Sequence, residues 1–331
     1  MKKGLTEFEL IELLRGRAPG SGRLLTGIGD DAAVTVPGGA TAVTVDAVVD
    51  GVHFRSGDSP PEQIAQKAIA TALSDLAAMA AEPGEVYVSA GLLRGSDDDF
   101  LKRLAHGLAE AAGRYGVALG GGDTVASPVL FLSVTAIGHA SSEHELVRRS
   151  GAGPDELVAV TGEIGGARAG LWLLGQDERE VTGLDERTRR KLIGRQMGPE
   201  PRLEAGTALG RAGVTAMIDL SDGLVADLGH LAEASGVGIT IEADRLPVEP
   251  GVEQVAAAAG RSAAEFVLGG GEDYELALAL PESRLESAVE AAGKAGLPLT
   301  VIGRTGAGHA GVEVISHGRV VPPAPGHDQL A

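Results

Sequence analysis

The chain has 331 residues, of which 44% are hydrophobic and only 3% aromatic, so its core must be built from Ala, Val, Leu and Ile. A net charge of −18 argues against nucleic acid and anionic membranes as partners, and an anionic substrate would need metal cations to offset the repulsion. The sequence has no cysteine, which excludes disulfides, thiolate metal sites and cysteine nucleophiles. The acidic N-terminus does not resemble a signal peptide and no apolar run is long enough to span a bilayer, so we expect a cytoplasmic protein.

Capping residues and apolar spacing predict helices and strands that alternate along the first half of the chain. Thr6 with Glu9 fits a capping box, and Ser59 and Pro60 with Glu62 mark the start of a second helix. The expected elements are a helix ending at Leu14, a strand over 41–49, a helix from Ser59 that Pro83 and Gly84 end, a strand over 85–93, a helix from Ser96, and strand, loop and strand over 116–138.

The pattern restarts after residue 150, which divides the chain into two α/β halves, 1–150 and 151–331. The elements expected in the second half are a strand over 157–162 with a helix behind it, a strand that breaks into an acidic turn and then a helix over 214–224, a strand over 236–243, a strand, glycine turn and strand over 265–280, and a strand over 298–305. The sequence therefore predicts two α/β domains of similar size.

Acidic residues at the ends of apolar elements are the most distinctive feature of this sequence. They are Asp30 with Asp31, Asp46, Asp75, Asp123, and Asp219 with Asp222. Asp75 lies inside a predicted helix beside the apolar stripe, where an unpaired carboxylate would cost several kcal/mol or more. Mg²⁺ binds one or two carboxylates together with water and substrate phosphates, so it suits these sites. The alternative is that each Asp is a cap or turn residue, as Asp222 before Gly223 could be.

Glycine-rich and basic motifs add weaker signals. The stretch GIGDDA at 27–32 resembles a dinucleotide fingerprint but precedes a strand-like run, and the chain has no P-loop and no kinase-type catalytic loop. The runs GGGDT at 120–124 and GGGEDYEL at 269–276 could bring backbone N–H groups close to phosphate. His53 lies in an acidic turn and is either functional or a surface turn residue. Arg148 and Arg149 are either a phosphate clamp or a solvated basic pair.

Taken together, the motifs resemble those of the thiamine-monophosphate kinase family, in the superfamily that also contains aminoimidazole ribonucleotide synthetase. The match spans nearly the whole chain through TEFELI, GIGDDAAV, TVDAVVDGVHF, ALSDLAAMAAEP, GGGDT, RRSGAGPDELVAVTG, IDLSDGL, GGGEDYEL and GHDQLA. The resemblance implies two α/β domains, with the N-terminal domains of a homodimer forming a shared β-barrel. It also implies direct transfer of the γ-phosphoryl group of ATP to thiamine monophosphate, assisted by several Mg²⁺ ions. That chemistry needs positioning and charge neutralisation rather than a nucleophilic side chain.

The resemblance also assigns residues to roles. It implies an N-terminal domain at 1–150 that binds ATP and metal and dimerises, and a C-terminal domain at 151–331 that completes the active site. The implied metal ligands are Asp30, Asp31, Thr44, Val45 through its carbonyl, Asp46, Asp75, Asp123, Asp219 and Asp222. The implied ATP-binding residues are Gly122, Asp123, Arg149 and Ser221, and the implied substrate-binding residues are His53, Glu272 and His327. His327 stands where the family commonly has an aromatic residue, and an imidazole stacks less strongly on a thiamine ring.

Two alternatives remain at this point. One is another ATP-dependent enzyme of the same superfamily, of the aminoimidazole ribonucleotide synthetase type, against which LSDLAAM and GGEDYEL argue. The other is a non-catalytic acidic protein that binds nucleotide or divalent cations. The selenide-activating and hydrogenase-maturation relatives depend on a cysteine or its selenium analogue, and this sequence has no cysteine.

Overall fold

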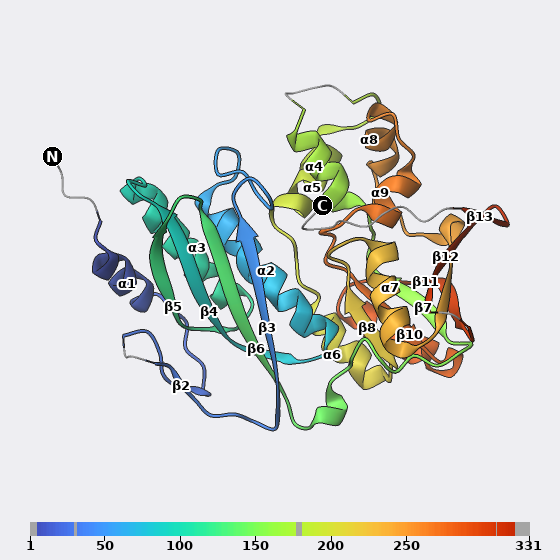
Figure 1. Ribbon diagram of the computed structural model, residues 1–331, viewed down its shortest axis with the longest axis horizontal. Helices are drawn as coiled ribbons and strands as arrows, with labels where there is room; N and C mark the ends of the chain where they lie inside the picture. The colour runs from blue at the N-terminus through green and yellow to red at the C-terminus, as the bar shows by residue number, and fades with distance from the viewer. Residues whose placement is uncertain (1–4, 30–31, 177–180, 309, 322–331) are drawn as a thin grey trace. The chain divides into compact units, whose positions relative to one another are not determined.

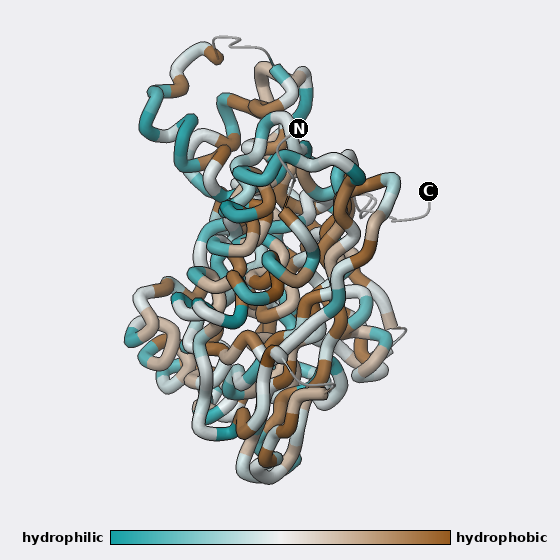
Figure 2. The backbone as a smooth tube through the Cα atoms, turned by 90° about the vertical axis from the view of Figure 1, so that its left-hand side faces the viewer, coloured by the Kyte–Doolittle hydropathy of each residue, from teal (hydrophilic) through white to brown (hydrophobic). Residues whose placement is uncertain are grey.

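The computed structural model describes residues 5–29, 32–176, 181–308 and 310–321. The chain forms two compact units (Figure 1). The N-terminal unit comprises Met1–Leu76 with Ala81–Glu143, and the C-terminal unit comprises Ala77–Ala80 with His144–Ala331. Hydrophobic and hydrophilic stretches alternate along the chain rather than separating into one apolar and one polar part (Figure 2). None of the described helices is both long enough and apolar enough to cross a membrane.

A four-stranded sheet forms the centre of the N-terminal unit, in the order β3-β6-β4-β5. Its strands are β3 (Ala40–Val49), β4 (Glu82–Leu93), β5 (Ala118–Ser127) and β6 (Phe131–Ala140), and the helices are α1 (Glu7–Arg15), α2 (Pro61–Ala78) and α3 (Asp98–Arg114). A separate pair consists of β1 (Leu24–Thr26) and β2 (Val34–Thr35). The strands β4 and β5 run parallel, which requires a crossover connection, and α3 provides it.

One face of this sheet is covered by helices and the other is not. Figure 1 shows α2 and α3 on one side of the four strands. Residues of β4 and β6 that face the helices, such as Val86 and Val134, are fully buried. On β3 the burial alternates, and the side chains of Val43 and Val45 are 60% and 65% exposed. The sheet therefore presents apolar side chains on a face that no described element of this unit covers.

The C-terminal unit is built on a seven-stranded mixed sheet in the order β13-β12-β9-β11-β7-β10-β8. Its strands are β7 (Leu157–Thr161), β8 (Ala216–Asp219), β9 (Gly238–Glu242), β10 (Leu276–Leu280), β11 (Leu299–Gly306), β12 (Gly311–Ser316) and β13 (Arg319–Val321). Its α-helices are α4 (Gly166–Leu174), α5 (Glu186–Met197), α6 (Leu203–Ala212), α7 (Leu224–Ser235), α8 (Val252–Ala258), α9 (Ala263–Gly269) and α10 (Leu285–Lys294). Short 3-10 helices lie at Glu143–Glu145, Ala243–Arg245 and Glu282–Arg284.

Apolar side chains cover both faces of the central strands in this sheet. Val158 and Val160 of β7 belong to one core cluster, whereas Leu157 and Ala159 belong to another. The residues of β10 divide between the two clusters in the same way. This arrangement explains why these strands are continuous apolar runs in the sequence rather than alternating ones.

Several predicted elements are confirmed and three are wrong. The capping box of Thr6 and Glu9 is present, and Asp97 caps α3. The loop expected in the GGGDT run does not exist, because β5 continues through it to Ser127. The strand expected at 265–269 is helix α9, which a capping box of Ser262 and Glu265 starts. Pro83 and Gly84 do not end α2; that helix ends at Ala78, and both residues lie in β4.

Candidate functional site

Two of the predicted metal ligands meet between β3 and α2. The Thr44 hydroxyl donates a hydrogen bond to Asp75 Oδ2 at 2.5 Å. Since alternate residues of a strand face the same side, Asp46 lies on this α2-facing side of β3, and Val45 faces the other side. Asp46 Oδ1 accepts the backbone N–H of Ala47 at 2.7 Å. The structure thus places Thr44, Asp46 and Asp75 on one side of the sheet.

Asp123 lies elsewhere in the same sheet. It belongs to β5, which forms the opposite edge from β3. Three strand spacings separate the two edges, or roughly 14 Å. Gly122 precedes Asp123, and a Cβ atom at Gly122 would lie 1.9 Å from the carbonyl oxygen of Val88. The close approach of β4 and β5 therefore requires glycine at this position. The role of Gly122 in nucleotide binding stays a prediction.

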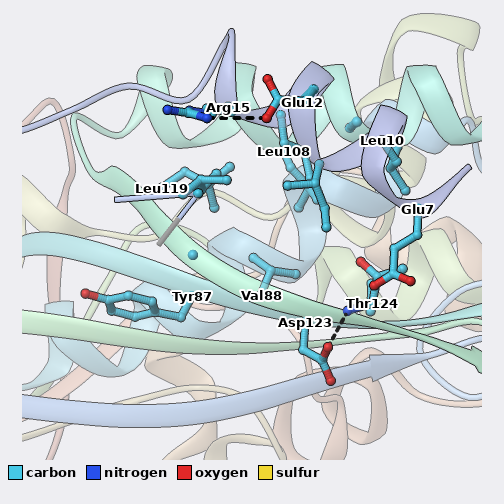
Figure 3. A pocket seen from close by; sticks show the side chains of 18 of the residues that line it. Glu7, Leu10, Glu12, Arg15, Tyr87, Val88, Leu108, Leu119, Asp123 and Thr124 are labelled. Atoms are coloured by element: carbon cyan, nitrogen blue, oxygen red, sulfur yellow. Dashed lines mark hydrogen bonds and ion pairs between the residues drawn. The ribbon is translucent and has the colours of Figure 1, made fainter. Parts of the chain in front are cut away.

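A cavity of about 690 Å³ lies beside Gly122 and Asp123. It is enclosed by α1, α3 and the strands β4 and β5, with Gly27, Ile28 and Gly29 also in its wall. Figure 3 shows Val88, Leu108 and Leu119 between the side chains of α1 and the strand that carries Asp123. The interior is therefore mainly apolar, and polar groups stand at its margins. Among them are Glu7, Asp123 and Thr124, together with Arg15, which forms an ion pair with Glu12 at 3.4 Å.

His53 is held in a tightly bonded turn after β3. Its Nδ1 accepts the backbone N–H of Val49 at 3.1 Å, so the neutral ring carries its proton on Nε2. The ammonium group of Lys67, a buried residue of α2, donates to the carbonyl oxygen of His53 at 2.8 Å. The side chain of Asp50 accepts two hydrogen bonds from Ser56. The turn therefore fixes both the tautomer and the backbone of His53, and the ring nitrogen that carries the donor is Nε2.

In the C-terminal unit, the acidic turn 219–223 is shaped by a residue that the sequence did not reveal. Asp227, in the first turn of α7, accepts the backbone N–H groups of Asp222 at 3.2 Å and Gly223 at 3.0 Å. Burial raises the pKa of Asp227 to about 8, and the charges of Asp219 and Asp222 contribute to this rise. Gly223 is the N-cap residue of α7, with no side-chain capping bond. The alternative that Asp222 caps this helix is therefore wrong.

The two motifs IDLSDGL and GGGEDYEL, which are distant in sequence, are hydrogen-bonded to each other. The backbone N–H of Glu272 donates to the carbonyl of Ser221 at 2.8 Å, and that of Tyr274 donates to the carbonyl of Leu220 at 2.9 Å. Register pairing of Leu276 with Asp219 continues this contact into the sheet. Glu272 has a φ of +67°, a left-handed conformation that is unusual for a residue with a side chain. The structure thus brings together Asp219, Ser221, Asp222 and Glu272.

A buried ionic network lies behind this pair of loops. Glu275 accepts hydrogen bonds from the Thr161 hydroxyl at 2.7 Å, from Arg195 at 3.0 Å, and from Arg202 at 2.5 and 3.0 Å. Asp273 accepts the backbone N–H groups of Gly165 at 2.6 Å and Ala167 at 3.0 Å, where α4 begins. Burial raises the pKa of Asp273 to about 6, while Arg195 opposes the rise.

The sequence does not predict this network, although it carries one signal of it. Asp273 and Glu275 stand directly before the apolar strand 276–280, where carboxylates need buried partners. The partners of Asp273 come from the start of α4, and those of Glu275 come from β7, α5 and the residue before α6. Nothing in the local pattern identifies these segments.

Some predicted site residues are not tested by this geometry. Asp30, Asp31 and His327 lie outside the described residues. Arg148 and Arg149 are exposed, and the carbonyl of Arg149 accepts a hydrogen bond from the Ser235 hydroxyl at 2.9 Å.

Among the residues that the structure describes, no three His, Asp or Glu side chains converge on a common point that could hold a metal ion. The donor groups themselves, which are carboxylates, a hydroxyl and backbone carbonyls, are the hard oxygen ligands that Mg²⁺ prefers.

The fold and these motifs place the chain in a known family. The AIR synthase related protein, N-terminal domain, matches residues 29–140, and the AIR synthase related protein, C-terminal domain, matches residues 153–315. The chain belongs to this family. It is 37% identical over 298 residues to the thiamine-monophosphate kinase of Salmonella typhimurium, and the aligned region covers 89% of each protein.

Solved structures give the same result. The crystal structure of thiamine-monophosphate kinase from Stenotrophomonas maltophilia K279a superposes with a TM-score of 0.83 at 34% identity, over 96% of this chain and 98% of that one. The structure of AaThiL complexed with AMPPCP and TMP superposes with a TM-score of 0.75 at 32% identity, over 97% of this chain and 96% of that one. The resemblance inferred from the sequence motifs is confirmed, and so is the two-domain α/β fold.

Proposed function

We propose that this protein transfers the γ-phosphoryl group of ATP to thiamine monophosphate and thereby completes thiamine diphosphate. A phosphate oxygen of thiamine monophosphate forms a bond to the γ-phosphorus, the bond to the β-γ bridging oxygen breaks, and ADP leaves. The observation that carries the proposal is the apolar cavity beside Gly122 and Asp123, in a chain whose relatives are thiamine-monophosphate kinases. A related structure holds AMPPCP, an ATP analogue, together with TMP, which supports both substrates.

The cavity suits the nucleoside part of ATP. Its volume of about 690 Å³ lies within the range of small-molecule sites, which are typically apolar with a few polar groups. The base occupies the apolar interior between Leu108 and Leu119, and the phosphates extend past Gly122 toward Asp123. Arg149 and Ser221 are assigned to the nucleotide as well.

The metal ligands are assigned to Asp30, Asp31, Thr44, Val45, Asp46, Asp75, Asp123, Asp219 and Asp222. Bound Mg²⁺ would neutralise the phosphate charge that this acidic chain otherwise repels. The residues themselves orient and bind: Thr44 holds one oxygen of Asp75, and Asp227 holds the turn that carries Asp222. His53 is assigned to the substrate as an Nε2–H donor, along with Glu272 and His327.

The N-terminal unit is proposed to form a homodimer through its sheet. Its four strands have an exposed apolar face at Val43 and Val45, and eight strands close a barrel that side chains can fill. Two copies supply that number. Joining edge strand β3 of one copy to edge strand β5 of its partner would place the strand that carries Asp46 next to the partner's strand that carries Asp123. Each active site would then combine residues of two chains, which explains why one sheet carries these ligands on opposite edges.

The experiment that tests this function measures thiamine diphosphate formed from ATP and thiamine monophosphate, with and without Mg²⁺. Free thiamine and an aminoimidazole ribonucleotide precursor serve as control substrates. We expect metal-dependent product from thiamine monophosphate alone. Binding of ATP without any thiamine diphosphate would overturn the substrate assignment, with His327 as the first position to change. Turnover of the aminoimidazole precursor instead would favour the alternative enzyme of the same superfamily.

A further inference from the structure

The side chain of Gln196 contacts Glu272 directly. Gln196 lies in the last turn of α5, and 4% of the residue is exposed. Its Nε2 atom donates a hydrogen bond to Glu272 Oε2, across 76 positions of the chain. The contact therefore joins the helix α5 to the loop that follows α9. No local sequence pattern predicts that these two segments meet.

The position of Gln196 along α5 is fixed by its neighbours. Gly170 of α4 faces it so closely that a Cβ at Gly170 would lie 2.1 Å from the carbonyl oxygen of Leu192 and 3.1 Å from Cβ of Gln196. Arg195, the preceding residue, donates to the carbonyl of Glu163 and to Glu275 Oε1, each at 3.0 Å. Because α5 is packed against α4 on one side and bonded to the ionic network on the other, the backbone of Gln196 is held in place.

The backbone of Glu272 is equally constrained. Its N–H is bonded to Ser221, and its φ of +67° lies in a sparsely populated region that the surrounding loop must impose. The hydrogen bond from Gln196 then orients the side chain. Backbone and side chain together hold the carboxylate in one place.

The chemistry of the donor matters as much as its position. An amide N–H is neutral, so it orients a carboxylate without cancelling its charge, whereas Lys or Arg at the same place would neutralise it. A carboxylate held in this way suits a cationic or hydrogen-bond-donating group. Thiamine monophosphate carries both, in its thiazolium ring and its aminopyrimidine amine.

We propose that Gln196 is a positioning residue that orients Glu272 toward the thiamine part of the substrate. The proposal rests on the proposed function, because it takes Glu272 as a substrate contact. It assigns Gln196 to recognition of thiamine monophosphate and not to ATP binding or to phosphoryl transfer.

The test replaces Gln196 by Met, which keeps the length and volume of the side chain and removes the donor. We expect the KM for thiamine monophosphate to rise about 10-fold, since a hydrogen bond to a charged group is lost. We expect kcat and the KM for ATP to stay within about twofold of wild type, because the proposal gives Gln196 no role in ATP binding or in phosphoryl transfer. Gln254→Met, at an exposed position on α8, is the matched control and leaves all three unchanged.

A double-mutant comparison separates positioning from a general structural role. In a Glu272→Gln background, Gln196→Met should raise the KM for thiamine monophosphate no further, since its target is already altered. Should Gln196→Met fold poorly, Gln196→Asn provides a second variant that keeps the amide but withdraws it by one methylene, with an intermediate KM expected. An unchanged KM in an active Gln196→Met protein, or effects of the two substitutions that multiply, overturns this assignment alone. A wild type that makes no thiamine diphosphate overturns the proposed function and this assignment with it.

Discussion

Asp227 accepts the backbone N–H of Asp222 at 3.2 Å, so one acidic residue of α7 holds the turn that carries another. The same oxygen of Asp227 accepts the N–H of Gly223 at 3.0 Å. Burial and the nearby charges of Asp219 and Asp222 raise the pKa of Asp227 to about 8. At neutral pH Asp227 is therefore mainly protonated, and it serves as a neutral acceptor for two buried donors.

This relationship predicts different effects for two substitutions of Asp227. Asp227→Asn keeps a neutral oxygen acceptor of the same size but takes up no proton on folding, so at pH 7 the variant should be more stable than wild type. Asp227→Ala leaves two N–H groups without their acceptor and should be about 1–3 kcal/mol less stable than Asp227→Asn. Urea denaturation in EDTA measures both values. Equal stabilities of the two variants would show that Asp227 does not hold the turn, and a wild type as stable as Asp227→Asn at pH 7 would show that Asp227 is ionised in the folded state.

The pH dependence of stability follows from the same pKa. The unfolded carboxyl titrates near its ordinary value of 3.8 and the folded one near 8, so the folded state binds more protons between these limits. Stability contributed by Asp227 is therefore fully present below about pH 4 and is lost as pH rises to 8, with a slope of up to about 1.4 kcal/mol per pH unit. Asp227→Asn lacks this slope, so its stability relative to wild type should increase as pH rises from about 4 to 8. Asp273, whose pKa burial raises to about 6, is present in both proteins and cancels in the difference.

Asp75 gives a prediction for activity. In Asp75→Asn the amide oxygen can still accept the hydrogen bond from Thr44, so the melting temperature should change by only a few degrees. The negative charge is lost, and with it metal binding at this position, so phosphoryl transfer should fall by at least about 100-fold. Glu110→Gln, at an exposed position on α3, is the control and should be fully active. Near-normal turnover of Asp75→Asn would refute its assignment as a metal ligand.

Local sequence signals predicted most elements of the fold, and their failures have physical causes. Caps such as Thr6 with Glu9 act within one helical turn, so the sequence shows them directly. The glycine run 120–122 suggests a loop, yet it lies within β5. Glycine is needed at Gly122 because Val88 of the neighbouring strand leaves no room for a side chain. The apolar run at 265–269 is too short to distinguish strand from helix by its periodicity. Pairing with β4 decided the first case, whereas a local signal, the capping box of Ser262 and Glu265, starts the helix in the second.

The candidate site was predictable only in its residue types. The position of acidic residues at the ends of apolar elements singled out Asp46, Asp75 and Asp219, of which Asp219 is buried and the other two are half-buried. The partners that shape the site are not visible in the same way. Asp227 resembles an ordinary helix residue, and Gln196 resembles a polar position in a charged helix. Their roles depend on contacts between segments far apart in the chain.

The ionic network predicts a large cost for removing Arg202. Its guanidinium forms two hydrogen bonds to Glu275, and its side chain is 14% exposed, against 1% for Glu275. Breaking a buried pair costs about 3–5 kcal/mol, and since Arg195 still pairs with Glu275 we expect about 2–3 kcal/mol for Arg202→Met. Arg245→Met removes an exposed pair with Glu242 and should cost less than about 1 kcal/mol. Denaturant unfolding compares the two, and equal costs would contradict the buried network.

The proposed dimer makes its own prediction, because each active site would take Asp46 from one copy and Asp123 from the other. Asp46→Asn and Asp123→Asn should each be inactive as pure proteins. When the two are mixed, unfolded and refolded together, half of the dimers contain one copy of each, and one of their two sites has both carboxylates. Activity should then recover to about a quarter of wild type.

A second mixture serves as the control for this complementation. Asp46 and Asp75 lie on the same side of the sheet in one copy, where Thr44, on the strand of Asp46, is hydrogen-bonded to Asp75. Both carboxylates of a site therefore come from the same copy, and no mixed dimer of Asp46→Asn with Asp75→Asn regains an intact site. Recovery with Asp123→Asn but not with Asp75→Asn would establish a site shared between two chains, joined through β3 and β5. If neither mixture recovers although mixed dimers form, each chain holds its own complete set of ligands. The edge-to-edge joining of the two sheets would then have to be abandoned.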